Sequence, residues 1–164
     1  MATVYLGLGS NIGDKIDLIK KSLEIMENNY AIKVKKISSF YETEPMEYKN
    51  QDWFVNAVAE IETKLSPEQL LEVINEIEIE IERIRTLKWG PRSIDIDILY
   101  YDQELVATSE LQIPHIRISA RPFVLIPLDE IAKDVKHPIL NKTPMEMYDM
   151  LYFPSVVKKL DLAS

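Results

Sequence analysis

The sequence predicts an α+β fold, in which an antiparallel sheet carries helices packed on one face. Segments with apolar residues at every second position and segments with helical spacing follow one another in the order βαββαβ. The length of 164 residues is typical of one domain. A hydrophobic content of 46% and a charged content of 28% are ordinary for a globular protein with its own core.

The chain begins with a predicted strand and a predicted helix. Residues 3–8 alternate between apolar and other side chains, so we expect a strand. The glycine-rich stretch 7–14 lacks the spacing of a phosphate-binding loop, and we interpret it as a turn whose glycines adopt positive φ. Asp14 or Asn11 could cap the helix that follows, which should end near Glu27.

Two further strands are expected over 32–41 and 53–63, joined by a polar loop over 42–52. In the second of these strands, Phe54 and Asn56 fall on the same face. A ring for stacking and an amide for hydrogen bonding would suit a flat heterocycle. The alternative is that an exposed pair of this kind is incidental.

The next helix has a clear start at Ser66, because Gln69 completes a capping box with it. Apolar residues keep helical spacing from there to Ile84. Residues 77–82 also alternate as a strand would, but the cap and the longer period favour a helix. We expect its glutamates to form a solvated face.

After the fourth main strand, the sequence predicts a C-terminal helical extension. A short strand is expected over 105–107, a helix opening at Arg121 and a last helix over 143–151. His137 is assigned to the surface, and the residues after 153 show no pattern. The βαββαβ order is typical of the ferredoxin-like split βαβ arrangement, a fold that hosts many functions.

The stretch 94–98 carries the strongest indication of chemistry. Three isoleucines alternate with Asp95 and Asp97, so both carboxylates should project from the face opposite the core. Their Cα atoms should lie about 7 Å apart, a separation from which both can reach divalent cations such as Mg²⁺. Residues 83–92 immediately upstream hold four cations and no acid, as Mg²⁺-bound polyphosphate requires. The alternative is an ordinary strand with one wet face.

Composition excludes some classes of function. A net charge of −8 and a pI near 4.9 disfavour binding to nucleic acid or to an anionic membrane. The chain has no cysteine, no apolar run approaching the roughly 20 residues of a membrane helix and no signal peptide pattern, so we expect a cytoplasmic protein. Against this acidic background, the basic clusters at 83–92 and 115–121 suit a small anion.

Five ordered motifs resemble one known family. Residues 89–99 read W-G-P-R-S-I-D-I-D-I-L, and the other motifs lie at 5–11, 39–45, 54–58 and 113–123. Together they resemble 6-hydroxymethyl-7,8-dihydropterin pyrophosphokinase, a folate-pathway enzyme. The resemblance implies one catalytic domain over 1–164, acting as a monomer with two Mg²⁺ ions. It implies transfer of pyrophosphate from ATP to the pterin hydroxymethyl group, with release of AMP.

The same resemblance assigns roles residue by residue. The catalytic residues would be Arg83, Arg92, Asp95 and Asp97, with Asp95 and Asp97 also binding the metal. The ATP-binding residues would be Glu78, Arg83, Arg85, Trp89, Arg92, Ile98, His115 and Arg121. The pterin-binding residues would be Thr43, Pro45, Met46, Phe54, Asn56, Trp89, Asp95 and Phe123. Arg85 is expected in a loop after the helix, and that loop is one residue shorter than in some relatives.

Two rival functions come from other classes. A two-metal phosphoesterase or nuclease would use the same aspartates, but it needs more carboxylates or histidines than these loops supply. A catalytically silent binding module, including an RNA-binding one, is disfavoured by the acidic pI and by the absence of aromatic RNA-binding motifs.

Overall fold

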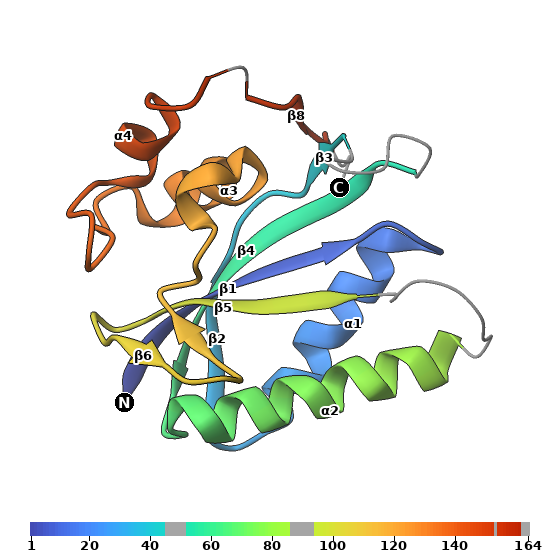
Figure 1. Ribbon diagram of the computed structural model, residues 1–164. Helices are drawn as coiled ribbons and strands as arrows, with labels where there is room; N and C mark the ends of the chain where they lie inside the picture. The colour runs from blue at the N-terminus through green and yellow to red at the C-terminus, as the bar shows by residue number, and fades with distance from the viewer. Residues whose placement is uncertain (45–51, 86–93, 153, 162–164) are drawn as a thin grey trace.

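The computed structural model describes residues 1–44, 52–85, 94–152 and 154–161 (Figure 1). The main elements follow the predicted order of strands and helices. They are β1 (Ala2–Ser10), α1 (Lys15–Glu27), β2 (Ile32–Ile37), β3 (Tyr41–Thr43), β4 (Phe54–Thr63), α2 (Pro67–Arg85) and β5 (Asp95–Tyr101). The C-terminal part contains β6 (Val106–Ala107), β7 (Gln112–Ile113), a 3-10 turn (Ile118–Ala120), α3 (Pro122–Ala132), α4 (Pro144–Tyr148) and β8 (Val157–Lys159).

The main sheet is antiparallel in all its strand pairs. β1 lies between β5 and β4, and β4 pairs along its other edge with both β2 and β3. This order, with α1 and α2 as the connections, confirms the predicted ferredoxin-like fold. β8 adds an outer strand beside β3, and β6 and β7 form a separate small hairpin.

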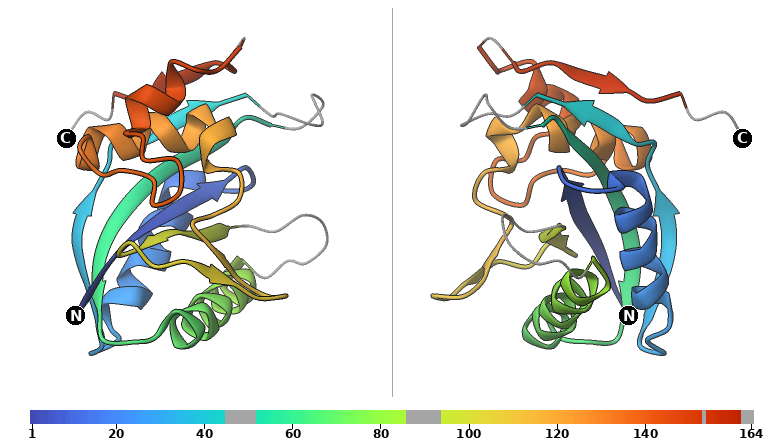
Figure 2. Two further views of the ribbon diagram at one scale, coloured as in Figure 1. Left: turned by 60° about the vertical axis from the view of Figure 1, so that its left-hand side comes forward. Right: turned by 90° about the vertical axis from the view of Figure 1, so that its right-hand side faces the viewer.

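Two cores lie on opposite faces of the sheet (Figures 1 and 2). The larger core joins α1 and α2 to the isoleucines and leucines predicted to face inward, including Leu6, Ile61 and Ile96. The smaller core joins α3 and α4 to Val58 and Tyr100 on the other face. The C-terminal extension therefore covers part of the face that lies opposite the two connecting helices.

Side-chain caps start α1, α2 and α4, whereas α3 begins after Arg121 without one. The Asp14 side chain accepts a hydrogen bond from the Asp17 N–H at the start of α1. Ser66 and Gln69 exchange the two bonds of a capping box. A second capping box starts α4, although this helix ends at Tyr148 and not at 151 as predicted.

The glycine-rich stretch differs from the prediction, because most of it is strand. Gly7 and Gly9 belong to β1, and Gly13 alone of the described glycines has positive φ, at 71°. A Cβ atom on Gly9 would lie 2.5 Å from Asn56 Oδ1 on the neighbouring strand, closer than side-chain atoms normally approach. Gly9 is therefore needed for the close approach of Asn56.

The predicted strand 32–41 is broken into β2 and β3. Ser38 causes the break: its N–H donates to the Val58 carbonyl at 2.8 Å, and its Oγ accepts from the Val58 N–H at 2.9 Å. A side-chain oxygen thus replaces a backbone carbonyl in the ladder. The β1–β5 register also shifts, which places Leu99 and Tyr100 together in the smaller core.

One expectation about the C-terminal part is wrong, and one strand there was not predicted. His137 is 7% exposed and packs edge-on against Tyr100, where its Nδ1 accepts from the Ile139 and Leu140 N–H groups. The residues after 153, which showed no pattern, include β8. Within the described ranges, no helix has the length and apolar character needed to cross a membrane.

Candidate active site

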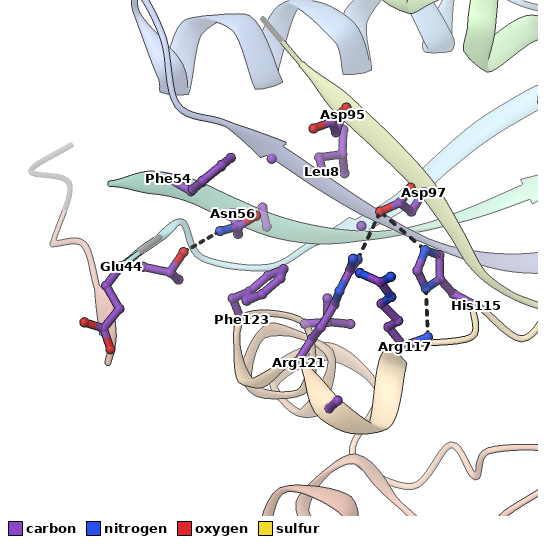
Figure 3. A pocket seen from close by; sticks show the side chains of 16 residues that line it. Leu8, Glu44, Phe54, Asn56, Asp95, Asp97, His115, Arg117, Arg121 and Phe123 are labelled. Carbon is purple, nitrogen blue, oxygen red and sulfur yellow. Dashed lines mark hydrogen bonds and ion pairs between the residues drawn. The ribbon is translucent and has the colours of Figure 1, made fainter. Parts of the chain in front are cut away.

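A cavity of about 520 Å³ opens between the sheet and the start of α3 (Figure 3). Strands β1, β3, β4 and β5 supply one wall, and the segment from His115 into α3 supplies the other. The predicted site residues that line it are Thr43, Phe54, Asn56, Asp95, Asp97, His115, Arg121 and Phe123. Residues far apart in the sequence thus meet in one cavity.

One end of the cavity combines two rings with an oriented amide. Phe54 comes from β4 and Phe123 from α3, and Asn56 lies between them in Figure 3. The Asn56 Nδ2 donates to Thr43 Oγ1 at 2.8 Å, a bond that fixes which edge the amide presents. Asn56 is only 8% exposed, so the bond is largely shielded from water. A flat ring with donor and acceptor edges fits this end.

The other end combines carboxylates with cations. The Asp97 Oδ2 lies 3.6 Å from Arg121 Nη1 and 3.8 Å from His115 Nε2. The Asp97 side chain is 42% exposed, so these ion pairs contribute little to stability, on the order of 1 kcal/mol or less. Asp95 lines the cavity from the same strand face. The alternation predicted for Asp95 and Asp97 is confirmed.

His115 is held in one orientation by the backbone. The Arg117 N–H donates to His115 Nδ1 at 3.2 Å, which leaves Nε2 to carry the proton of the neutral ring. Burial lowers the pKa of His115; Asp97 opposes this, and Arg121 and Arg117 add to the lowering. The neutral imidazole therefore presents an Nε2–H donor beside Asp97, where an anionic oxygen could accept it.

The donors at this end fit a hard divalent cation. Asp95 and Asp97 offer carboxylate oxygens from one strand face, the ligand type that Mg²⁺ prefers. Among the described residues, no group of three acidic, histidine or cysteine side chains could hold a metal alone. Any Mg²⁺ bound here would thus take further ligands from water or from substrate oxygens.

Three predicted ATP-binding residues lie apart from the cavity lining. Arg83 is exposed on α2, and its Nη1 lies 3.4 Å from Glu80 Oε1. Glu78 accepts a hydrogen bond from the Ile96 N–H at 3.0 Å, so it is not purely a solvated residue of α2. Ile98 is 4% exposed within the larger core, which leaves only its backbone for a ligand contact.

The remaining predicted site residues lie at the end of α2 or outside the described residues. Arg85 is the last residue of α2 and does not begin the following loop as expected. Pro45, Met46, Trp89 and Arg92 lie outside the described residues.

Two charged residues that line the cavity were not predicted as site residues. Arg117 contributes an exposed guanidinium to the cationic side, and Glu44 follows β3 at the opposite end. The signals for Arg117 in the sequence were its places in the basic cluster 115–121 and in the motif 113–123. Glu44 lies in the motif 39–45, but the resemblance assigned roles there only to Thr43 and Pro45.

Comparisons with known proteins show which family this sequence is similar to. The model of the family described as 7,8-dihydro-6-hydroxymethylpterin-pyrophosphokinase (HPPK) matches residues 5–133. A 2-amino-4-hydroxy-6-hydroxymethyldihydropteridine pyrophosphokinase of Aquifex aeolicus is 46% identical over 142 residues, which cover 87% of this chain and 88% of the relative. The Bacillus subtilis protein of the same name is 43% identical over 132 residues, covering 80% and 79%.

Solved structures agree on the fold. Wild-type Plasmodium falciparum HPPK-DHPS, solved with pteroate, superposes with a TM-score of 0.72 at 20% identity. The match covers 90% of this chain and 42% of that longer one. With the family model spanning most of the sequence and two relatives above 40% identity over most of their own length, the chain belongs to the HPPK family of pyrophosphokinases.

Proposed function

We propose that this chain transfers the pyrophosphoryl group of ATP to the hydroxymethyl group of 6-hydroxymethyl-7,8-dihydropterin and releases AMP. The reaction belongs to folate biosynthesis. The observation that carries the proposal is one cavity with two chemically different ends. Phe54, Phe123 and Asn56 suit a pterin ring, and Asp95 and Asp97 with neighbouring cations suit a metal-bound triphosphate.

The reaction requires positioning and charge neutralisation more than covalent help from the protein. The pterin oxygen attacks the β-phosphorus, and the bond between that phosphorus and the oxygen leading to the α-phosphorus breaks. Asp95 and Asp97 would hold two Mg²⁺ ions, which supply neutralisation of the phosphate charge. Arg121 and the His115 Nε2–H would then bind phosphate oxygens.

In the ligand-free arrangement, Asp97 pairs with both Arg121 and His115. Binding of the metal–nucleotide complex would exchange these contacts: the carboxylate turns to the cation, and the protein cations turn to the phosphates. Because the Asp97 carboxylate is partly exposed, these ion pairs are weak and the exchange should cost little free energy. A monomer with one catalytic domain over 1–164, located in the cytoplasm, completes the proposal.

A product assay tests the proposal directly. The protein is incubated with Mg²⁺, ATP and 6-hydroxymethyl-7,8-dihydropterin, and the nucleotides are then separated. We expect AMP in a one-to-one ratio with pterin pyrophosphate, formed only when the pterin is present. ADP as product would mean attack at the γ-phosphorus, and nucleotide consumption without an acceptor would favour a phosphohydrolase.

The variant Asp95→Asn/Asp97→Asn separates catalysis from binding. Turnover should fall by orders of magnitude, because the variant loses both proposed metal ligands. The pterin should still bind at the aromatic end of the cavity. Unchanged turnover in this variant would remove both aspartates from the catalytic machinery.

A further inference from the structure

Strand β8 forms the outer edge of the sheet beside the cavity. Its register pairs Lys159 with Tyr41, Lys158 with Glu42 and Val157 with Thr43. Two contacts extend the pairing at its ends: the Leu160 N–H donates to the Phe40 carbonyl at 2.9 Å, and the Glu44 N–H donates to the Val156 carbonyl at 3.4 Å. The whole of β3 is thus held between β4 and β8.

β3 needs this support because it is only three residues long. Its last residue, Thr43, is 1% exposed and accepts the Asn56 amide hydrogen bond inside the cavity. Glu44, the next residue, lines the cavity, and its Oε1 accepts from the Val156 N–H at 2.9 Å. Any shift of β3 along or away from β4 would therefore change the orientation of the Asn56 amide.

The other end of β3 is fixed from α3. Glu130 accepts hydrogen bonds from the Ser39 N–H and Oγ and from the Tyr41 hydroxyl. Lys159 of β8 adds a favourable electrostatic interaction with the same carboxylate. β8 thus completes a frame in which β3 is held by β4, by α3 and by the last strand of the chain.

We infer that the segment 156–160 is a positioning element for the pterin-binding end of the cavity. It acts through β3: the segment holds Thr43 and Glu44 in place, and Thr43 in turn orients the Asn56 amide. This inference rests on the proposed function. It concerns a segment that the family model does not cover, because that match ends at residue 133.

The direction of the N–H groups in β8 provides a matched pair of variants. The Val156 and Leu160 N–H groups point towards β3, so by alternation the Lys158 N–H does too and the Lys159 N–H points away. Lys158→Pro removes a donor to β3. Lys159→Pro also introduces a proline into β8 and also removes one positive charge, but it keeps the N–H groups that donate to β3.

We expect Lys158→Pro to raise both KM and Kd for the pterin by about fivefold, the factor that corresponds to one net hydrogen bond. The kcat and the KM for ATP should change by less than about twofold, because the metal and phosphate groups lie at the other end of the cavity. Lys159→Pro should keep the wild-type KM and Kd for the pterin, and the loss of its charge near Glu130 should appear only as a lower thermal midpoint. Val156→Pro, which removes only the donor to Glu44 at the strand end, should reproduce the pterin effect with a smaller structural change.

Far-UV circular dichroism and thermal midpoints show whether each variant is folded. If both lysine variants lower the midpoint and neither changes pterin affinity, β8 is a stability element only and the inference is wrong. Equal changes in the KM values for ATP and pterin would also overturn it. Absence of turnover in the wild type would instead contradict the proposed function, and pterin Kd would still test the role of β8.

Discussion

Arg117 is a cation of the cavity whose charge is available to a ligand. Among the described residues its guanidinium has no carboxylate partner, whereas Arg121 pairs with Asp97. Arg117→Ala should therefore raise the KM for ATP by about tenfold, as the loss of a charged hydrogen bond predicts, and leave the KM for pterin near that of the wild type. Steady-state kinetics with each substrate varied in turn measure both constants.

Lys133→Ala is the matched control for this prediction. Lys133 is exposed just after α3, so its removal changes the net charge equally without touching the cavity. Equal effects of the two variants would mean that Arg117 acts through the overall field of the protein and not through contact with phosphate.

The Tyr100 hydroxyl is a buried polar group without a hydrogen-bond partner among the described residues. The side chain is 1% exposed, and burial raises its pKa. Tyr100→Phe should raise the free energy of unfolding by about 1 kcal/mol, because it removes an unsatisfied donor and keeps the ring contacts with Tyr5 and His137. Urea denaturation measures the change; a loss of stability would show that an ordered water pairs with the hydroxyl.

Residues on regular strands were the most predictable part of the site. The two-residue period placed Asp95 with Asp97 and Phe54 with Asn56, and all four line the cavity. Two features have no such period. The need for Gly9 depends on a cross-strand approach to Asn56, and the place of Arg117 depends on how the loop before α3 packs.

At the scale of elements, capping and long apolar periods located α1, α2 and the main strands. β3 and β8 were missed because three residues cannot show a period, and their pairing depends on neighbouring strands: β3 lies between β4 and β8. The His137 assignment failed for a similar reason. Its burial comes from contact with Tyr100, which the alternation of β5 did not predict because the register shifts there.

The bond network of Glu130 joins α3 to β3 and should make stability depend on pH. Burial raises the pKa of Glu130, but hydrogen bonds from Tyr41 and Ser39, with Lys159 nearby, outweigh burial and lower it overall. A carboxyl whose pKa is lower in the folded state stabilises that state at pH values above its pKa in the unfolded chain, which is about 4.3 for glutamate. This contribution is lost as the pH falls through the lower, folded-state value.

The variant Glu130→Gln isolates that contribution. The difference in free energy of unfolding between wild type and variant should be largest near pH 6 and should shrink as the pH falls below about 4.3. Urea denaturation at several pH values measures it. Glu72→Gln, on an exposed part of α2, is the control, and the same pH dependence in both comparisons would contradict a specific role for Glu130.

For the whole molecule, the sequence predicted the sheet, the helices on one face and the two aspartates on the other face, but not that further helices cover part of that other face. α3 and α4 cover part of that face through the smaller core, and the cavity forms where this cover ends beside β1, β4 and β5. The apolar pattern of α3 predicts that it is buried. The same pattern does not predict where α3 packs on the sheet, because that position depends on contacts between segments far apart in the sequence.

A site built from both layers links ligand binding to global stability. A non-cleavable ATP analogue with Mg²⁺ should raise the thermal midpoint, because a ligand at 100 times its Kd stabilises the folded state by about 2.7 kcal/mol. Without Mg²⁺ the shift should be much smaller, since the phosphate charges would face Asp95 and Asp97 directly.

In Asp95→Asn/Asp97→Asn the repulsion is gone, so the analogue should give similar shifts with and without Mg²⁺. Differential scanning fluorimetry of both proteins under both conditions measures the four midpoints, and a Mg²⁺-dependent shift that survives in the variant would place the metal on other residues.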